Sequence, residues 1–285
     1  MYHILTQLWM ELLHQGFAED GSLWDWSSLG LVTDRIKAQV VAKSDGVWAA
    51  ETLVLAVEQS FPGIDARSLL NDGAKFKRGQ VLVELKGDFK FLIALERPFL
   101  NLAAYVSGIA TATQETVDAV RLACPEQTPR VTLTRKTLPG YRDLAIHAVR
   151  LGGGHPHRVS LSGGVLIKEN HIAAAGSMER AVAGARASAP HGLKIEVEVR
   201  NRDELKQALL IGVDGVMLDN FSSDEVSSAV QWLHSRQSHL FIEVSGGLNL
   251  QNVAHYALPG VDVLSVGSLT HSVQCVDLSF LVDGT

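Results

Sequence analysis

The chain has 285 residues, of which 46% are hydrophobic and 20% are charged. This composition is typical of one large or two ordinary globular domains and excludes a disordered protein. The 25 Lys and Arg residues stand against 31 Asp and Glu residues, a formal net charge of −6, so nucleic acid and anionic membranes are not expected partners. Cys124 and Cys275 are far apart, which favours neither a disulfide framework nor a zinc site.

The first residues predict a short amphipathic helix rather than a targeting segment. Met1–Gly16 has no Lys or Arg and carries Glu11, which is unlike a signal peptide. No apolar run reaches the roughly 18 residues that a membrane-spanning helix needs. The two widely separated cysteines indicate a reducing environment, so we expect a cytoplasmic protein. Four of the five tryptophans lie within the first 50 residues, where packing or an interface is their expected role; they are Trp9, Trp24, Trp26 and Trp48.

The pattern along the chain changes near residue 110. Before it, short apolar runs broken by turns such as Asn71–Gly73 indicate mixed α and β structure. Across it, the apolar spacing of Pro98–Ala123 predicts a long helix with Pro98 near its first turn. Gly108 in this helix marks a kink or a close contact.

Beyond residue 160, strands and helices alternate, which is typical of parallel βαβ units. The predicted strands are Val165–Lys168, Lys194–Val199, Gly215–Leu218, Leu240–Val244 and Val261–Val266. The helix starts between them carry capping signals at Ser177, Asn201 with Glu204, Ser222 with Glu225, and Asn249. Polar residues recur where the strands end, as at the active-site rim of an α/β barrel, and we therefore prefer a barrel to a doubly wound sheet.

Two cation-rich segments precede the first of these strands. Arg135 and Lys136 are adjacent within Thr134–Thr137, and His157 and Arg158 follow the glycine run 152–154. Such groups suit an anionic ligand, and the glycines permit close backbone approach. Exposed cations and a flexible loop are the alternatives for the two segments taken singly. Residues 130–171 hold seven Lys and Arg against two acidic residues, a basic stretch in an acidic chain.

The predicted strand ends carry further chemistry. Lys168 ends its strand, where its amine serves either as a Schiff-base nucleophile or as a less demanding contact for an anion. Alternation places Glu196 and Glu198 on the same face of their strand. With Asp219 on the next strand, these carboxylates are candidates for binding Mg²⁺ or sugar hydroxyls, and a salt-bridge network is the alternative.

Glycine-rich loops follow the last two predicted strands. They are Ser245-Gly246-Gly247 and Gly267-Ser268. Loops of this kind at the final strands of a barrel bind phosphate through backbone N–H groups. The residues alone therefore predict a barrel enzyme that acts on a phosphorylated and otherwise anionic small molecule.

The chain resembles the quinolinate phosphoribosyltransferase (carboxylating nicotinate-nucleotide pyrophosphorylase) family in a series of collinear segments between about residues 96 and 280. The segments are Glu96–Asn101, Ser107–Thr111, Thr134–Gly140, Gly152–Gly154 with His157-Arg158, Leu166–His171, Glu196–Val199, Met217–Asn220, Glu243–Gly247 and Ser265–His271. Residues 1–95 match in the order of their elements more than in their residues.

The resemblance implies an N-terminal α/β sandwich and an incomplete α/β barrel of the type II phosphoribosyltransferase class. The implied domains are residues 1–108 and 109–271, with the tail 272–285 packing back on the first. It also implies a homodimer or larger assembly with shared active sites. The implied reaction transfers phosphoribose from phosphoribosyl pyrophosphate to quinolinate with loss of CO₂, giving nicotinate mononucleotide for NAD biosynthesis, and Mg²⁺ accompanies the pyrophosphate.

Site roles follow from the same resemblance. The two quinolinate carboxylates would be held by Arg135, His157, Arg158 and Lys168, with Arg97 from a neighbouring subunit. Lys136 and His171 would lie near the pyrophosphate, and Glu198 and Asp219 would face the ribose and the metal. The 5′-phosphate would be held or flanked by Ser245, Gly246, Gly247, Gly267 and His271, and Asn220 and Ser268 complete the binding set. Lys136, Lys168, Glu198 and Asp219 are the implied catalytic residues.

Two positions depart from the family pattern. Leu133 stands where Asp is usual before Thr-Arg-Lys-Thr, and Pro156 stands where Asn is usual before His-Arg. The Pro-His-Arg form is similar to ModD-like proteins of molybdenum transport operons, but that branch departs from Ile-Lys-Glu-Asn-His, which this chain retains at 167–171. The alternatives are a paralogous phosphoribosyltransferase for another heteroaromatic acid, a barrel enzyme of another class using Lys168, and a non-catalytic binding protein.

Overall fold

The structure, a computed structural model, describes residues 2–20, 25–31, 35–236 and 238–283. The chain divides into two compact units, each built from separate segments. The first contains Met1–Gln114, Asp143–Gly152 and Val273–Thr285, and the second contains Glu115–Arg142 and Gly153–Ser272. None of the helices in the described residues is long and apolar enough to cross a membrane.

The first unit is built on a four-stranded antiparallel sheet of order β12-β1-β5-β3. Its strands are β1 (Arg35–Ala42), β3 (Asp65–Ser68), β5 (Val81–Asp88) and β12 (Leu278–Val282), and β2 (Gly46–Val47) pairs separately with β4 (Lys75–Phe76). Its helices are α1 (Tyr2–Glu19), α2 (Trp26–Leu29), α3 (Glu51–Ser60), most of α5 (Arg142–Leu151) and the first part of α4 (Phe89–Ala123). Every second residue of β1 is buried from Ala38 to Ala42, because one face of this sheet packs on the core.

Helix α4 begins at Phe89, nine residues before the predicted start at Pro98. The carboxylate of Asp88 accepts the N–H groups of Lys90 (3.0 Å) and Phe91 (3.3 Å) and so caps the first turn. Pro98 therefore lies inside the helix, and the prediction that it marks the first turn was wrong. Close packing accompanies this proline, since a Cβ on Gly16 would lie 2.9 Å from the Pro98 ring.

Gly108 makes the close contact that its sequence position suggested. A Cβ at this residue would lie 2.4 Å from the carbonyl oxygen of Gln274. Two of the N-terminal tryptophans, Trp9 and Trp48, are fully buried and donate to Thr52 (2.9 Å) and Ser68 (3.0 Å). The packing prediction is thus confirmed for these two, whereas Trp26 is 78% exposed and Trp24 lies outside the described residues.

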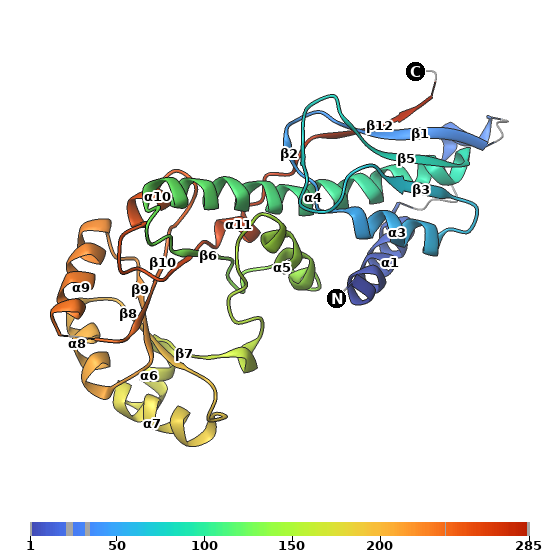
Figure 1. Ribbon diagram of the computed structural model, residues 1–285. Helices are drawn as coiled ribbons and strands as arrows, with labels where there is room; N and C mark the ends of the chain where they lie inside the picture. Colours follow the sequence, from blue (N-terminus) through green and yellow to red (C-terminus); the bar gives the residue numbers. More distant parts are fainter. Residues whose placement is uncertain (1, 21–24, 32–34, 237, 284–285) are drawn as a thin grey trace. The chain divides into compact units, whose positions relative to one another are not determined.

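The second unit is an open barrel of six parallel strands in the order β6-β11-β10-β9-β8-β7, with helices outside the sheet (Figure 1). The strands are β6 (Arg130–Thr132), β7 (Val165–Ile167), β8 (Ile195–Val199), β9 (Gly215–Asp219), β10 (Phe241–Ser245) and β11 (Val263–Ser265). The helices are α6 (Glu169–Ala175), α7 (Met178–Ser188), α8 (Arg202–Ile211), α9 (Ser223–Ser235), α10 (Val253–Tyr256) and α11 (Ser268–His271), with a 3₁₀ turn at Leu161–Gly163. The sheet ends at β6 and β7, which confirms the predicted incomplete barrel; β6 is a strand that the sequence did not reveal.

Of the four predicted helix caps, two are confirmed, one is confirmed in part and one was wrong. Ser177 caps α7, and Ser222 with Glu225 forms a capping box at α9, as predicted. Asn201 caps α8, but Glu204 accepts the N–H of Arg200 (2.8 Å) instead of completing a box. The predicted helix start at Asn249 was wrong, because Asn249 accepts the N–H of Gln251 (3.0 Å) in a turn and α10 begins at Val253.

Candidate active site

A pocket of about 410 Å³ lies at the carboxyl ends of the barrel strands. It contains most of the residues that the sequence singled out. Those lining it are Arg135, Lys136, His157, Arg158, Lys168, Glu198, Asp219, Asn220, Ser245, Gly246 and Gly247. Strand register explains the convergence, because Asp219 pairs with Ser245 and Ser245 pairs with Ser265, so these strand ends form one rim.

The segment after α5 brings His157 and Arg158 to the barrel interior. His155 forms a parallel bridge with Thr132, and its N–H donates to the carbonyl of Val131 (2.8 Å). The backbone of this segment thereby extends the sheet at the outer edge of β6, where the barrel is open. The guanidinium of Arg158 donates to the carbonyl of Gly164 (3.2 Å), which fixes the other end of the segment.

The cations of the pocket crowd one another. Burial lowers the pKa of Arg158, and the like charge of Arg135 adds to this effect, while Glu196 and Glu243 oppose it. The Nε atom of Arg135 is buried without a hydrogen-bond partner in the described part of the chain. An anionic ligand would relieve this repulsion, so the arrangement favours a substrate with more than one negative group.

Lys168 lies directly after β7 and forms an ion pair with Glu198 of β8. Burial raises the pKa of Glu198, and the hydrogen bond from Lys168 counteracts that increase. The backbone N–H of Lys168 also donates to Nδ1 of His171 (2.9 Å), so the neutral form of this histidine carries its proton on Nε2. The ion pair with Glu198 suits an electrostatic contact better than a Schiff-base nucleophile.

Asp219, Asn220 and Gly246 form a compact unit at the neighbouring strand ends. Asn220 adopts a left-handed backbone conformation (φ 58°), donates its amide to Asp219 (2.8 Å), and donates its N–H to the carbonyl of Ser245 (2.9 Å). A Cβ on Gly246 (φ 101°) would lie 2.4 Å from the Asn220 side chain and 2.7 Å from its backbone nitrogen. Only glycine fits at residue 246, which explains one of the two glycines in this loop.

Several predicted site residues do not line the pocket. Gly267, Ser268 and His271 follow β11, whose last residue Ser265 does line it. Gly267 lies against the His271 ring, since a Cβ there would be 3.0 Å from Nε2. His171 touches the pocket residue Lys168. Arg97 belongs to the first unit, where it pairs with Glu96 (2.8 Å).

The pocket is also lined by three residues to which the sequence analysis gave no site role, although they lie in its motif segments. Thr134, Glu243 and Ser265 contribute polar atoms to its lining. A signal for Glu243 was present, because it lies two residues before Ser245 on one strand and therefore shares its face. The two residues that depart from the family pattern do not line this pocket: Leu133 is buried, and Pro156 faces a second cavity.

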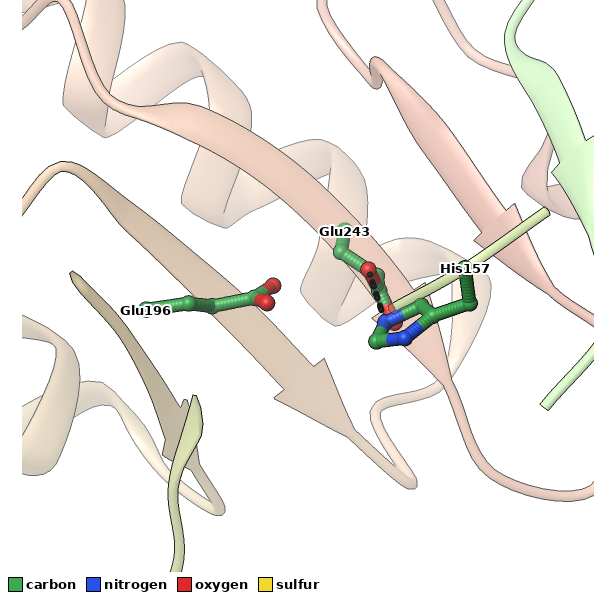
Figure 2. Close-up of side chains that lie close together, drawn as sticks. All are labelled: His157, Glu196 and Glu243. Atoms are coloured by element: carbon green, nitrogen blue, oxygen red, sulfur yellow. Dashed lines mark hydrogen bonds and ion pairs between the residues drawn. The ribbon is translucent and has the colours of Figure 1, made fainter. Parts of the chain in front are cut away.

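That second cavity, of about 380 Å³, lies at the amino ends of the strands and shares His157, Arg158, Leu166 and Glu243 with the first. Between the two cavities, the side chains of His157, Glu196 and Glu243 point toward one another from separate segments (Figure 2). Burial, followed by the charge of Glu243, raises the pKa of Glu196 to about 9. One of its oxygens has no hydrogen-bond partner in the described residues.

The rim offers oxygen ligands for a divalent cation. Asp219 and Glu198 both line the pocket and interact electrostatically, and Mg²⁺ prefers carboxylate and phosphate oxygens. One oxygen of each carboxylate is already engaged, that of Glu198 by Lys168 and that of Asp219 by the Asn220 amide. This donor set fits Mg²⁺ bound by one or two carboxylates together with a substrate phosphate.

An open α/β barrel with cations, carboxylates and glycine loops at one rim defines an enzyme that acts on a small anionic substrate. The quinolinate phosphoribosyl transferase family matches the chain in both parts, the N-terminal domain at residues 25–107 and the C-terminal domain at residues 109–281. The chain belongs to this family and is a phosphoribosyltransferase.

Individual relatives agree with that assignment. The chain is 41% identical over 246 residues to a nicotinate-nucleotide pyrophosphorylase [carboxylating] of Mycobacterium leprae, covering 85% of each protein. It is 38% identical over 274 residues to a probable enzyme of the same name from Bacillus subtilis, covering 94% of this chain and 91% of the relative. The solved structure of the nicotinate-nucleotide pyrophosphorylase from Francisella tularensis is similar with a TM-score of 0.88 at 32% identity, over 98% of this chain and 97% of that one.

Proposed function

We propose that the protein transfers phosphoribose from phosphoribosyl pyrophosphate to the ring nitrogen of quinolinate, and that nicotinate mononucleotide, pyrophosphate and CO₂ are its products. The observation that carries the proposal is the convergence of Arg135, His157, Arg158 and Lys168 on one pocket beside two carboxylates. Four basic side chains in one pocket suit a ligand with two carboxylates, such as a pyridine dicarboxylate. The names of the relatives support the same substrate.

In this proposal the chemistry is mainly electrostatic. The ring nitrogen forms a bond to C1′ as the bond from C1′ to pyrophosphate breaks, and the sugar passes through an oxocarbenium-like state. Glu198 and Asp219 stabilise positive charge on the sugar, and Lys136 stabilises negative charge on the leaving group. The C2 carboxylate then leaves as CO₂, its bonding electrons remain beside the positive ring nitrogen, and a proton takes its place.

The remaining rim groups divide between phosphate and metal. The loops at Ser245–Gly247 and Gly267–Ser268, flanked by His171 and His271, hold the phosphate groups through backbone N–H and imidazole donors. Asp219 and Glu198 would hold Mg²⁺ together with substrate oxygens. When bound, this cation supplies positive charge against the pyrophosphate.

The test is incubation of the purified protein with quinolinate, phosphoribosyl pyrophosphate and Mg²⁺. We expect equal amounts of nicotinate mononucleotide and of CO₂ derived from the 2-carboxylate. Nicotinate in place of quinolinate is the control and should give no comparable turnover. Absence of product from quinolinate, with turnover of another heteroaromatic acid, would establish the paralogue instead.

We also propose that Arg97 completes the active site of a neighbouring subunit in a homodimer or larger assembly. Its side chain is 66% exposed within this chain and is available for such a contact. Mixing Arg97→Ala subunits with Lys168→Ala subunits should restore part of the activity, because one site of each hybrid keeps both cations. Verified hybrids that remain as inactive as the two parents would argue against shared sites.

A further inference from the structure

Four polar residues form a buried hydrogen-bonded chain across one side of the barrel. Thr132 of β6 lies 2.8 Å from Ser265 of β11, Ser265 lies 2.6 Å from Glu243 of β10, and Glu243 lies 3.2 Å from Nε2 of His157. Thr132, Ser265 and Glu243 are 4%, 2% and 2% exposed, and the His157 side chain is 14% exposed. Figure 2 shows the last link of this chain, from Glu243 to the imidazole.

The donors and acceptors of the chain can be ordered. An ionised Glu243 only accepts, so the Ser265 hydroxyl donates to one of its oxygens and must in turn accept from Thr132. The other oxygen of Glu243 accepts from Nε2 of His157. Each oxygen of this buried carboxylate thus has a donor, which a desolvated charge requires.

The same ordering sets the state of the other imidazole nitrogen. With Nε2–H committed to Glu243, a neutral His157 would carry only a lone pair on Nδ1, which repels a carboxylate. In the imidazolium, Nδ1–H becomes a donor while Nε2–H keeps its bond to Glu243. Since His157 lines the carboxyl-end pocket, this second donor can serve an anionic substrate group.

We propose that Glu243 is a positioning residue for the reaction. It orients the His157 ring and balances its charge, so that Nδ1–H donates to a carboxylate of the heteroaromatic acid, while Ser265 and Thr132 hold Glu243 in place. The inference rests on the proposed function, because it assigns His157 to that substrate. Glu243 acts through His157 and need not touch the substrate.

Other charged groups surround the pair. Arg158 follows His157 in the chain, Glu196 of β8 approaches from across the barrel, and Arg135 and Lys168 line the same pocket. The ligating atoms of His157, Glu196 and Glu243 lie within 4.8 Å of one another, which is a spacing that a metal ion would also accept. Arg158 interacts with both carboxylates, and this cation disfavours a metal there.

The experiment is a double-mutant cycle on quinolinate binding and turnover. Glu243→Gln keeps the volume of the side chain and should raise the KM for quinolinate about tenfold, the effect of losing one charge-assisted hydrogen bond. It should change kcat and the KM for phosphoribosyl pyrophosphate far less. In a His157→Ala background, Glu243→Gln should raise the quinolinate KM no further, because its effect passes through His157.

Ser265→Ala provides a milder perturbation if Glu243→Gln folds poorly. It removes one hydrogen bond to Glu243 and should raise the quinolinate KM about two- to fivefold. Glu179→Gln, an exposed exchange of the same type on α7, is the matched control and should leave every constant unchanged. Thermal unfolding of each variant identifies loss of fold.

Three outcomes would overturn the proposal. The first is independent, additive effects of Glu243→Gln and His157→Ala. The second is an unchanged quinolinate KM in folded Glu243→Gln and Ser265→Ala proteins. The third is a stoichiometric metal ion in the purified wild-type protein, measured by elemental analysis, that His157→Ala removes. A wild-type protein that is inactive on quinolinate would instead refute the proposed function. The double-mutant cycle tests only the role of Glu243.

Discussion

The rim of the barrel and the layer of side chains beneath it use charge in opposite ways. At the rim, the exposed side chain of Lys136 borders an open pocket, where water stabilises its charge at little cost. One layer deeper, Glu243 is 2% exposed and Glu196 is 7% exposed. There a carboxylate must either be fully hydrogen-bonded or remain protonated.

Of the two buried glutamates, one is hydrogen-bonded on both oxygens and the other is protonated. Glu243 has donors on both of its oxygens, from Ser265 and His157. Glu196 has an oxygen with no partner in the described residues, and its raised pKa of about 9 keeps it protonated at neutral pH. The difference teaches that residues on the same inward face of a barrel need not share a role: changes at the rim should affect catalysis, and changes below it should affect stability as well.

The largest expected effect is at the rim. Lys136→Ala removes an exposed cation beside the proposed leaving group and should lower kcat/KM about 10²- to 10³-fold, as loss of a transition-state contact does. Its unfolding temperature should match that of the wild type, because the side chain is exposed. Steady-state kinetics and thermal unfolding measure the two effects. Near-normal turnover in this variant would contradict the placement of the site.

A smaller effect is expected for the backbone that supports the rim. Gly246→Ala should destabilise the protein by about 1–3 kcal/mol, because its Cβ would meet the backbone nitrogen of Asn220 at 2.7 Å and its φ of 101° is strained for alanine. Gly247→Ala is the matched comparison, since residue 247 also has a positive φ (65°) but no atom within 4 Å of its Cβ position. Denaturant unfolding should therefore rank Gly246→Ala well below Gly247→Ala, and equal losses would show that steric contact with Asn220 is unimportant.

The sequence revealed the barrel because each of its later strands is apolar and ends in a polar residue. Strand β6 escaped notice because Val131 is the only apolar residue within Arg130–Thr132, whereas the equally short β7 and β11 lie in longer apolar runs. The start of α4 was misplaced because Pro98 looks like a first-turn residue, whereas Asp88 caps the helix and tertiary packing accepts the proline.

The sequence predicted the charged residues that border the pocket, but it did not predict the buried residues that hydrogen-bond to them and hold them in place. Lys168 and Asp219 are recognisable by charge at the ends of apolar strands, and Arg135 is recognisable by its pairing with Lys136. The function of Glu243 depends on Ser265 and His157, which are 22 and 86 residues away in sequence. Only the register of parallel strands brings such groups together, so local patterns cannot indicate their contacts.

A last prediction tests the layer below the rim through the dependence of stability on pH. In the folded protein Glu196 keeps its proton up to a pH of about 9, whereas in the unfolded chain it loses it near its ordinary value of 4.5. The folded state binds more protons in this window, so the contribution of Glu196 to stability falls as pH rises from about 4.5 to 9. Glu196→Gln removes the titration, and its stability relative to wild type should improve between pH 5 and pH 8 by at least about 1 kcal/mol, since each unit of raised pKa corresponds to about 1.4 kcal/mol. Denaturant unfolding at the two pH values gives this difference, and the exposed exchange Glu179→Gln should show none.

If the relative stability of Glu196→Gln were the same at both pH values, Glu196 would be ionised in the folded protein, and the contrast between the two buried glutamates would disappear.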